Sequence, residues 1–150
     1  MMERLTKSAT RNIFYGGSGF FLLLFVALTV HSHVYMVTTS APDSALSEGV
    51  IRGKEVWERN SCINCHSLLG EGAYFAPELG NVWKRYGGKD DPAGARDMLA
   101  AWMASQPSGV PGRRQMPQFN LTEKDVSALA DFLEFVSKIN TQGWPPNDAG

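Results

Sequence analysis

The chain has 150 residues, 43% of them hydrophobic and 19% charged, and its formal net charge is −1. This length is typical of one domain, and the near-neutral balance excludes a nucleic-acid binder that works through a basic face. The charge is unevenly divided. Residues 1–40 carry +2, because Arg4, Lys7 and Arg11 outnumber Glu3, and the remaining residues carry −3.

An apolar segment occupies the N-terminal part of the chain. Residues 13–37 contain no Asp, Glu, Lys or Arg over 25 positions, and a helix needs about 20 apolar residues to cross a bilayer. The preceding basic residues favour an N-terminus in the cytoplasm. We therefore predict a cytoplasmic N-terminus over residues 1–11 and a single membrane-spanning helix, surrounded by lipid, over residues 12–37.

A cleaved signal peptide is the alternative interpretation of this segment. Its apolar region would be about 7–15 residues long and would end at a small-residue cleavage site, which Thr39-Ser40-Ala41-Pro42 matches poorly. An uncleaved anchor is therefore favoured. His31 and His33 near its outer end are either interfacial polar residues or contacts to a partner subunit.

A short linker over residues 38–47 follows the anchor. Ser47 is a good N-cap for a helix that runs through Glu58. Its apolar members are Val50, Ile51, Val56 and Trp57.

The motif Cys62-Ile63-Asn64-Cys65-His66 has the C-x-x-C-H spacing of covalent c-type haem attachment, with His66 as an axial ligand of the iron. A structural zinc site would need four ligands, whereas the chain beyond the anchor offers only these two thiols and one imidazole. A thioredoxin-like thiol pair would lie in a βαβ pattern, which is not apparent. The motif predicts one covalent haem.

The rest of the chain alternates turns and helices. We expect residues 67–90, which are rich in glycine, to form a loop around one edge of the haem. Asp91 and Pro92 are typical of a helix start, and that helix should run to about Ser105. Its apolar positions are Met98, Leu99, Trp102 and Met103.

The last predicted helix begins after Thr122 in a near capping box and ends near Asn140. Its helical periodicity is carried by Val126, Leu129, Leu133 and Val136, with Phe132 and Phe135 beside them. Residues 141–150 form a C-terminal tail. No strand is predicted, and the fold class that we expect is all-α.

A helix, the haem motif, a looping middle, a Met-Pro and a final amphipathic helix together resemble a class I cytochrome c over residues 48–140. The resemblance implies an all-α domain wrapped around one covalent haem. It also implies that Gly53 and Trp57 on the first helix pack closely against Leu129 and Phe132 on the last.

The resemblance further implies that the Pro77 carbonyl accepts the second ring N–H of His66, which would fix the orientation of the imidazole. Met116, fifty residues after His66 and before a proline, is the expected sixth ligand of the iron. Met98 and Met103 lie at helical spacing and are better interpreted as packing residues. A His/Met-ligated haem has no open position, so it should transfer electrons rather than bind substrate.

A narrower resemblance rests on residues 65–82, which read Cys-His-Ser-Leu-Leu-Gly-Glu-Gly-Ala-Tyr-Phe-Ala-Pro-Glu-Leu-Gly-Asn-Val, and on Arg113-Arg114-Gln115-Met116-Pro117. With the single anchor, they resemble the small, membrane-anchored cytochrome of bacterial nitric oxide reductase. That family passes electrons from a soluble periplasmic donor, a cytochrome c or a cupredoxin, to the haem b of a large polytopic catalytic subunit. There, two NO are converted to N2O and water, and this chain would carry no catalytic residue.

In that family a calcium ion lies between the two subunits, and the resemblance places the carbonyl of Gly72 and the hydroxyl of Tyr74 among its ligands. Oxygen ligands suit this hard cation. Tyr74 could instead bond a haem propionate.

Three functions are compatible with the motifs. The first is the electron-entry subunit of the reductase, with its haem domain on the periplasmic side of the inner membrane. A free-standing membrane-tethered electron shuttle is the second, although a linker of about ten residues gives it poor reach. A haem-based gas sensor is the third, and a sixth ligand at Met116 argues against it.

Overall fold

A computed structural model describes residues 6–40 and 46–143. The chain divides into two compact units, residues 1–41 and 42–150. Parts of three predictions lie outside the described residues: Arg4 in the N-terminal segment, residues 41–45 in the linker, and residues 144–150 in the tail.

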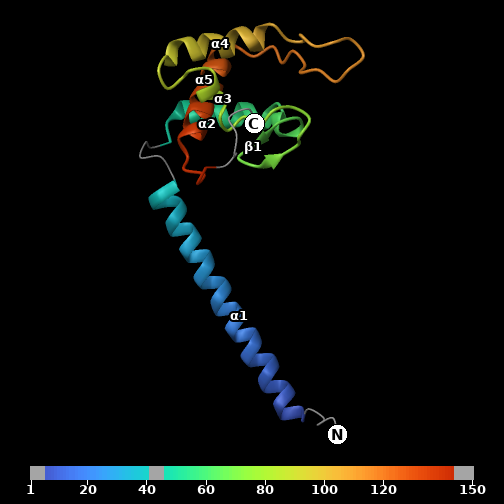
Figure 1. Ribbon diagram of the computed structural model, residues 1–150, viewed down its shortest axis with the longest axis vertical. Coiled ribbons are helices and arrows are strands. Elements are labelled where there is room, and N and C mark those ends of the chain that lie inside the picture. Colours follow the sequence, from blue (N-terminus) through green and yellow to red (C-terminus); the bar gives the residue numbers. More distant parts are fainter. Residues whose placement is uncertain (1–5, 41–45, 144–150) are drawn as a thin grey trace. The chain divides into compact units, whose positions relative to one another are not determined.

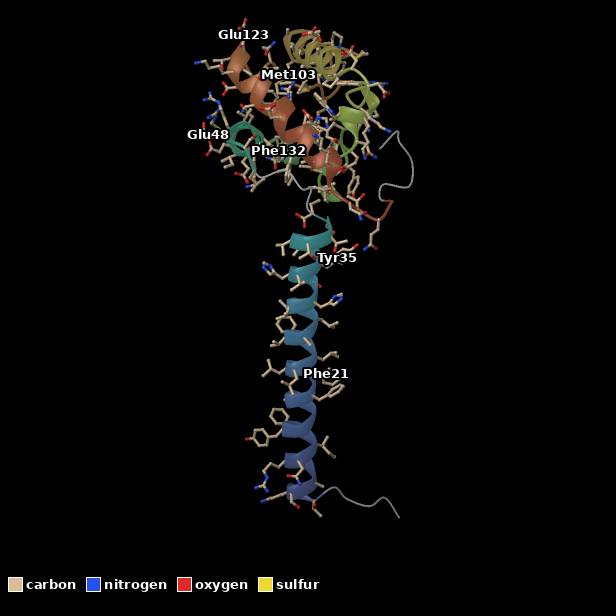
Figure 2. The ribbon with its side chains drawn as sticks, turned by 90° about the vertical axis from the view of Figure 1, so that its left-hand side faces the viewer. Phe21, Tyr35, Glu48, Met103, Glu123 and Phe132 are labelled. Atoms are coloured by element: carbon tan, nitrogen blue, oxygen red, sulfur yellow. The ribbon has the colours of Figure 1, made fainter. Side chains whose placement is uncertain are left out.

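The first unit is one long helix. α1 spans Lys7–Tyr35, begins at an N-cap in which the Thr6 hydroxyl accepts the amide of Ala9, and continues as a π-helical segment, η1, over Met36–Ser40. The 34 residues from Lys7 to Ser40 form a helix long and apolar enough to cross a membrane, with a mean hydropathy of 2.1 in its apolar window. Its apolar side chains are exposed, as Phe21 is in Figure 2.

The helices of the second unit begin where the sequence predicts. The hydroxyl of Ser47 accepts the amide of Val50, the carboxylate of Asp91 accepts the amide of Gly94, and Thr122 completes a capping box with Asp125. The three long helices are α2 Glu48–Arg59, α4 Pro92–Ala104 and α5 Glu123–Lys138.

The prediction of continuous loop over residues 67–90 is wrong in two places. β1 (Ser67–Leu68) pairs antiparallel with β2 (Glu71–Gly72) in a small hairpin, and α3 is a single turn over Val82–Arg85. The hairpin turn uses Leu69 and Gly70, both with positive φ (53° and 89°), which matches the twist of two-residue hairpins. A short 3-10 segment, η2, covers Cys62–Asn64.

The core of the second unit forms where α5 lies against α2 (Figure 1). Gly53 permits the close crossing, since a β-carbon there would overlap the carbonyl oxygen of Ala128 and lie 2.6 Å from the Cβ of Phe132. Beside this point the rings of Trp57 and Phe132 pack with centroids 6.3 Å apart. Phe132 and Met103, labelled in Figure 2, both belong to the core cluster.

Some residues expected on apolar helix faces are exposed. Ile51 on α2 is 48% exposed, and Met98 and Trp102 on α4 are 55% and 47% exposed. The buried positions of α4 are Ala95, Leu99 and Met103, spaced four apart, so its inner face is a narrow stripe that is partly built from alanine.

Asp125 is the charged group that links the start of α5 to α2. Its carboxylate lies 2.9 Å from Nη2 of Arg52 and 3.5 Å from Nη2 of Arg59, and only 11% of its side chain is exposed. Hydrogen bonds from the Thr122 side chain and from Arg52 lower the pKa of Asp125 from 3.8 to about 2.

The lowered pKa of Asp125 predicts a pH-dependent contribution to stability. The folded state binds this proton less readily than the unfolded chain, so the stabilisation is complete above about pH 4 and is lost as the pH falls toward about 2. Asp125→Asn should remove it. In urea titrations of the haem-loaded chain, the stability difference between wild type and variant should shrink over that window. The exposed Asp97→Asn serves as control, and a pH-independent difference at Asp125 would contradict the prediction.

Because α2 and α5 cross closely at Gly53, adding one methyl group there should lower the stability of the second unit. Gly53→Ala should destabilise the second unit by about 2–3 kcal/mol, because the helices must separate to admit the β-carbon. Ile51→Ala on the exposed side of α2 should change stability by less than about 0.5 kcal/mol. Denaturant unfolding monitored by tryptophan fluorescence measures both, and equal stabilities would argue that the helices tolerate a wider separation.

Candidate functional site

The two cysteines and His66 lie on a tight turn after α2. Ser61 adopts the left-handed conformation (φ 53°), and the amides of Cys65 and His66 both donate to the Cys62 carbonyl, at 3.1 and 2.9 Å. Both cysteines and His66 line one cavity of about 230 Å³. Among the described residues no group of three or more His, Cys, Asp or Glu side chains could hold a metal ion.

The electrostatic environment of Cys62 disfavours a thiol redox pair. Burial raises the pKa of its thiol from 9.0 to about 11. Reactive C-x-x-C pairs instead carry a thiol whose pKa is lowered toward or below neutrality. Cys62 is therefore a neutral, partly buried thiol that lines a mainly apolar cavity.

The His66 imidazole is held by a backbone acceptor. Its Nδ1 lies 2.9 Å from the carbonyl oxygen of Pro77, as the resemblance implied, and its ring centroid is 6.4 Å from that of Trp57. The amides of Phe75 and Ala76 donate to the carbonyl of Cys65, at 3.1 and 2.9 Å. These bonds fold the 73–77 segment back over the haem motif, and Nε2 of His66 is left for another partner.

Met116 shares its surroundings with His66. Both residues line the 230 Å³ cavity and an adjoining, deeper one of about 60 Å³, which also contain Cys62 and Asn60. The walls of the deeper cavity are mainly apolar and come from α2, α3, α4 and α5 and from the segments between them: Val56, Trp57, Leu79, Val82, Tyr86, Leu99, Trp102, Met103, Phe119, Leu121, Leu129 and Leu133. Met103 is one of these packing residues, whereas Met98 is exposed at the surface.

This arrangement fits a haem. The apolar walls suit a flat hydrophobic macrocycle, the two cysteines are placed for its edge, and an imidazole and a thioether face the same space. The donor set comprises one nitrogen and one sulfur, which is the combination found in electron-transfer cytochromes.

Gly72 and Tyr74 lie outside this cavity. The Tyr74 side chain is 74% exposed, and its hydroxyl donates to the Gly70 carbonyl at 3.1 Å. Gly72 has a φ of 121°, and a β-carbon there would overlap the carbonyl oxygen of His66. The two residues therefore lie on one exposed loop that packs its main chain against the haem motif.

Two features of the site were not predicted. The guanidinium of Arg114 lies 3.7 Å from the ring centroid of Phe75. The segment before Met116 and the segment before Pro77 therefore meet at the rim of the cavity. The buried Glu78, directly after Pro77, accepts hydrogen bonds from the main-chain amides of Leu69 and Gly80. Neither feature has a periodic or spacing signal in the sequence.

Comparison with known proteins agrees with this geometry. Residues 50–137 match the family described as cytochrome c. The chain belongs to the cytochrome c family. Such a domain carries covalently bound haem c, which the cavity and its two cysteines accommodate.

Among its relatives, a nitric oxide reductase subunit of Paracoccus denitrificans is 60% identical and the corresponding subunit of Cereibacter sphaeroides is 61% identical, each over 150 residues and the full length of both chains. Cytochrome c-551 of Ectopseudomonas mendocina is 31% identical over 81 residues, which are 54% of this chain and 93% of that one. Within the cytochrome c family, this chain therefore belongs with these nitric oxide reductase subunits along its whole length, apolar helix included.

Proposed function

We propose that this chain is the electron-transfer subunit of a membrane nitric oxide reductase. It accepts electrons from a soluble periplasmic donor and passes them to the haem b of a large polytopic catalytic subunit, where two NO become N2O and water. The observation that carries the proposal is identity of about 60% over the full length of the reductase relatives. The cavity lined by His66 and Met116 offers a place for the haem that electron transfer requires.

Each site residue has a separate role in this function. Cys62 and Cys65 would bind a haem through thioether bonds, and His66 and Met116 would hold its iron. A haem held there would supply one-electron transfer. Because the chain would supply two ligands to the iron, His66 and Met116, we assign NO chemistry to the partner subunit and no catalytic side chain to this chain.

Electron entry calls for an exposed surface close to the haem motif. Ile63 within the motif is 40% exposed and Phe75 at the cavity rim is 66% exposed, with Arg114 stacked on it. This surface is apolar and carries one cation, so we expect contact with the donor, a cytochrome c or a cupredoxin, to rely on apolar packing more than on charge steering.

The apolar helix anchors the chain in the inner membrane. Lys7 and Arg11 in its first turns favour a cytoplasmic N-terminus, which places the haem domain on the periplasmic side. Relatives that match the anchor as well as the haem domain support a resident subunit over a free-standing electron shuttle.

The same proposal assigns a calcium ion to the junction with the catalytic subunit, bound by the Gly72 carbonyl and the Tyr74 hydroxyl. The exposure of Tyr74 and its position on the loop of Gly72 support this assignment. The partner would complete the oxygen ligands that calcium requires.

Replacement of Met116 tests the proposed ligation and function together. Met116→Ala should keep the haem attached, because both cysteines remain, but it should lower the reduction potential and open the iron to added imidazole. Electron entry from the donor into the purified complex should slow by at least about tenfold. Spectroelectrochemistry and stopped-flow absorbance measure the two effects.

Met98→Ala is the matched control, because Met98 is exposed on α4 and should leave both quantities unchanged. A sulfur–iron charge-transfer band that survives in Met116→Ala would exclude Met116 as the ligand. A purified complex that reduces NO at full rate without this chain's haem would exclude the electron-entry function.

Replacement of Tyr74 tests the subunit junction. Tyr74→Phe removes one hydroxyl and should weaken subunit association or slow electron transfer between subunits, while the haem domain keeps its fold. Copurification with the catalytic subunit, with and without a calcium chelator, measures the effect. Tyr15→Phe on the anchor is the control, and wild-type assembly and NO turnover in Tyr74→Phe would remove Tyr74 from the junction.

A further inference from the structure

Glu78 is a buried carboxylate outside the set of haem-binding residues. It is 4% exposed, although the preceding Pro77 is at the surface. Its Oε1 accepts two main-chain amides, that of Leu69 at 2.7 Å and that of Gly80 at 2.8 Å. One oxygen thus joins the β1–β2 turn to the segment that follows Pro77.

The local backbone is shaped to admit this carboxylate. Gly80 has no β-carbon, and one placed there would lie 2.9 Å from Oε1 of Glu78. The Leu79 amide donates to the Ser67 carbonyl at 3.0 Å, and Nη2 of Arg85 donates to the carbonyl of Glu78 at 2.8 Å. Residues 78–80 are therefore held by bonds to the β1–β2 hairpin and to α3.

This anchorage bears on His66 through Pro77. The Pro77 carbonyl that bonds Nδ1 of His66 belongs to the peptide unit shared with Glu78, so the direction of that carbonyl is fixed by where Glu78 lies. On the other side, the Phe75 and Ala76 amides bond Cys65. Because Pro77 itself is exposed, packing does not hold it, and these flanking bonds do.

We propose that Glu78 is a positioning residue for the His66 ligand. By tying Leu69 to Gly80 through Oε1, it holds the Pro77 carbonyl against Nδ1 of His66, and so sets the strength of that bond and the electron donation of the imidazole to iron. The inference rests on the proposed role of His66 as the axial ligand.

Because the second carboxyl oxygen of Glu78 has no hydrogen-bond partner within the described parts of the chain, variants at this position can change its charge and its side-chain length independently. Among the described residues, Oε2 of Glu78 and Oγ of the fully buried Ser67 are buried side-chain oxygens without a hydrogen-bond partner. An amide at position 78 keeps Oε1 as acceptor and puts its NH2 where Oε2 lies. Glu78→Gln therefore retains the reach and loses the charge. Glu78→Asp retains the charge and loses the reach, because one methylene is missing.

The experiment measures solvent exchange of the His66 Nδ1–H in the reduced, haem-loaded full chain, labelled with ¹⁵N-histidine in detergent. The haem ring current separates this signal from those of His31 and His33. Exchange should be about tenfold faster in Glu78→Asp and in Glu78→Ala, and within about twofold of wild type in Glu78→Gln. Glu71→Gln, an exposed carboxylate of the same hairpin, is the matched control.

The reduction potential gives a second readout. A weaker bond to Nδ1 makes His66 a poorer donor, so the potential should rise in Glu78→Asp although the charge is kept. Wild-type exchange in Glu78→Asp, or exchange in Glu78→Gln as fast as in Glu78→Asp, would overturn the proposal. If Glu78→Ala fails to fold, the Asp and Gln variants decide. A wild-type His66 signal without the haem shift would instead overturn the ligand assignment.

Discussion

The close crossing of α2 and α5 at Gly53 is the constraint on which the haem domain depends. With no side chain at that point, the two helix backbones touch, and Trp57 and Phe132 pack one turn further along. Trp57 then lies beside the His66 ring and forms part of the cavity wall. The helix pair therefore acts as a rigid frame. The proposed iron ligands, His66 and Met116, lie on irregular segments between residues 60 and 121, outside this helix pair.

The sequence predicted what depends on local chemistry. Ser47, Asp91 and Thr122 cap helices at the expected positions because short polar side chains satisfy free amides wherever they precede a helix. The Pro77 bond to His66 was implied by the family resemblance and is present in the structure. Ligation of the iron by Met116 stays a prediction, although Met116 and His66 line the same cavity.

What the sequence could not predict depends on contacts between distant segments. The small hairpin needs positive φ at Leu69, a residue with no preference for it, and the exposure of Met98 depends on which face of α4 meets α5. The two bonds of Glu78 go to main-chain amides nine and two positions away, and bonds to the main chain leave no pattern of side chains in the sequence. The roles of Gly72 and Tyr74 toward calcium remain a proposal that rests on the resemblance and on their exposure.

The length of the apolar helix has a consequence for the bilayer around it. At 1.5 Å per residue, the 29 residues of α1 extend about 44 Å, against a hydrocarbon thickness of about 30 Å. The excess leaves both ends of the helix in the headgroup layers or allows the helix to tilt. In either case the mismatch can be absorbed without unfolding a turn. The anchor should thus tolerate changes in lipid chain length that would strain a helix cut to fit one thickness.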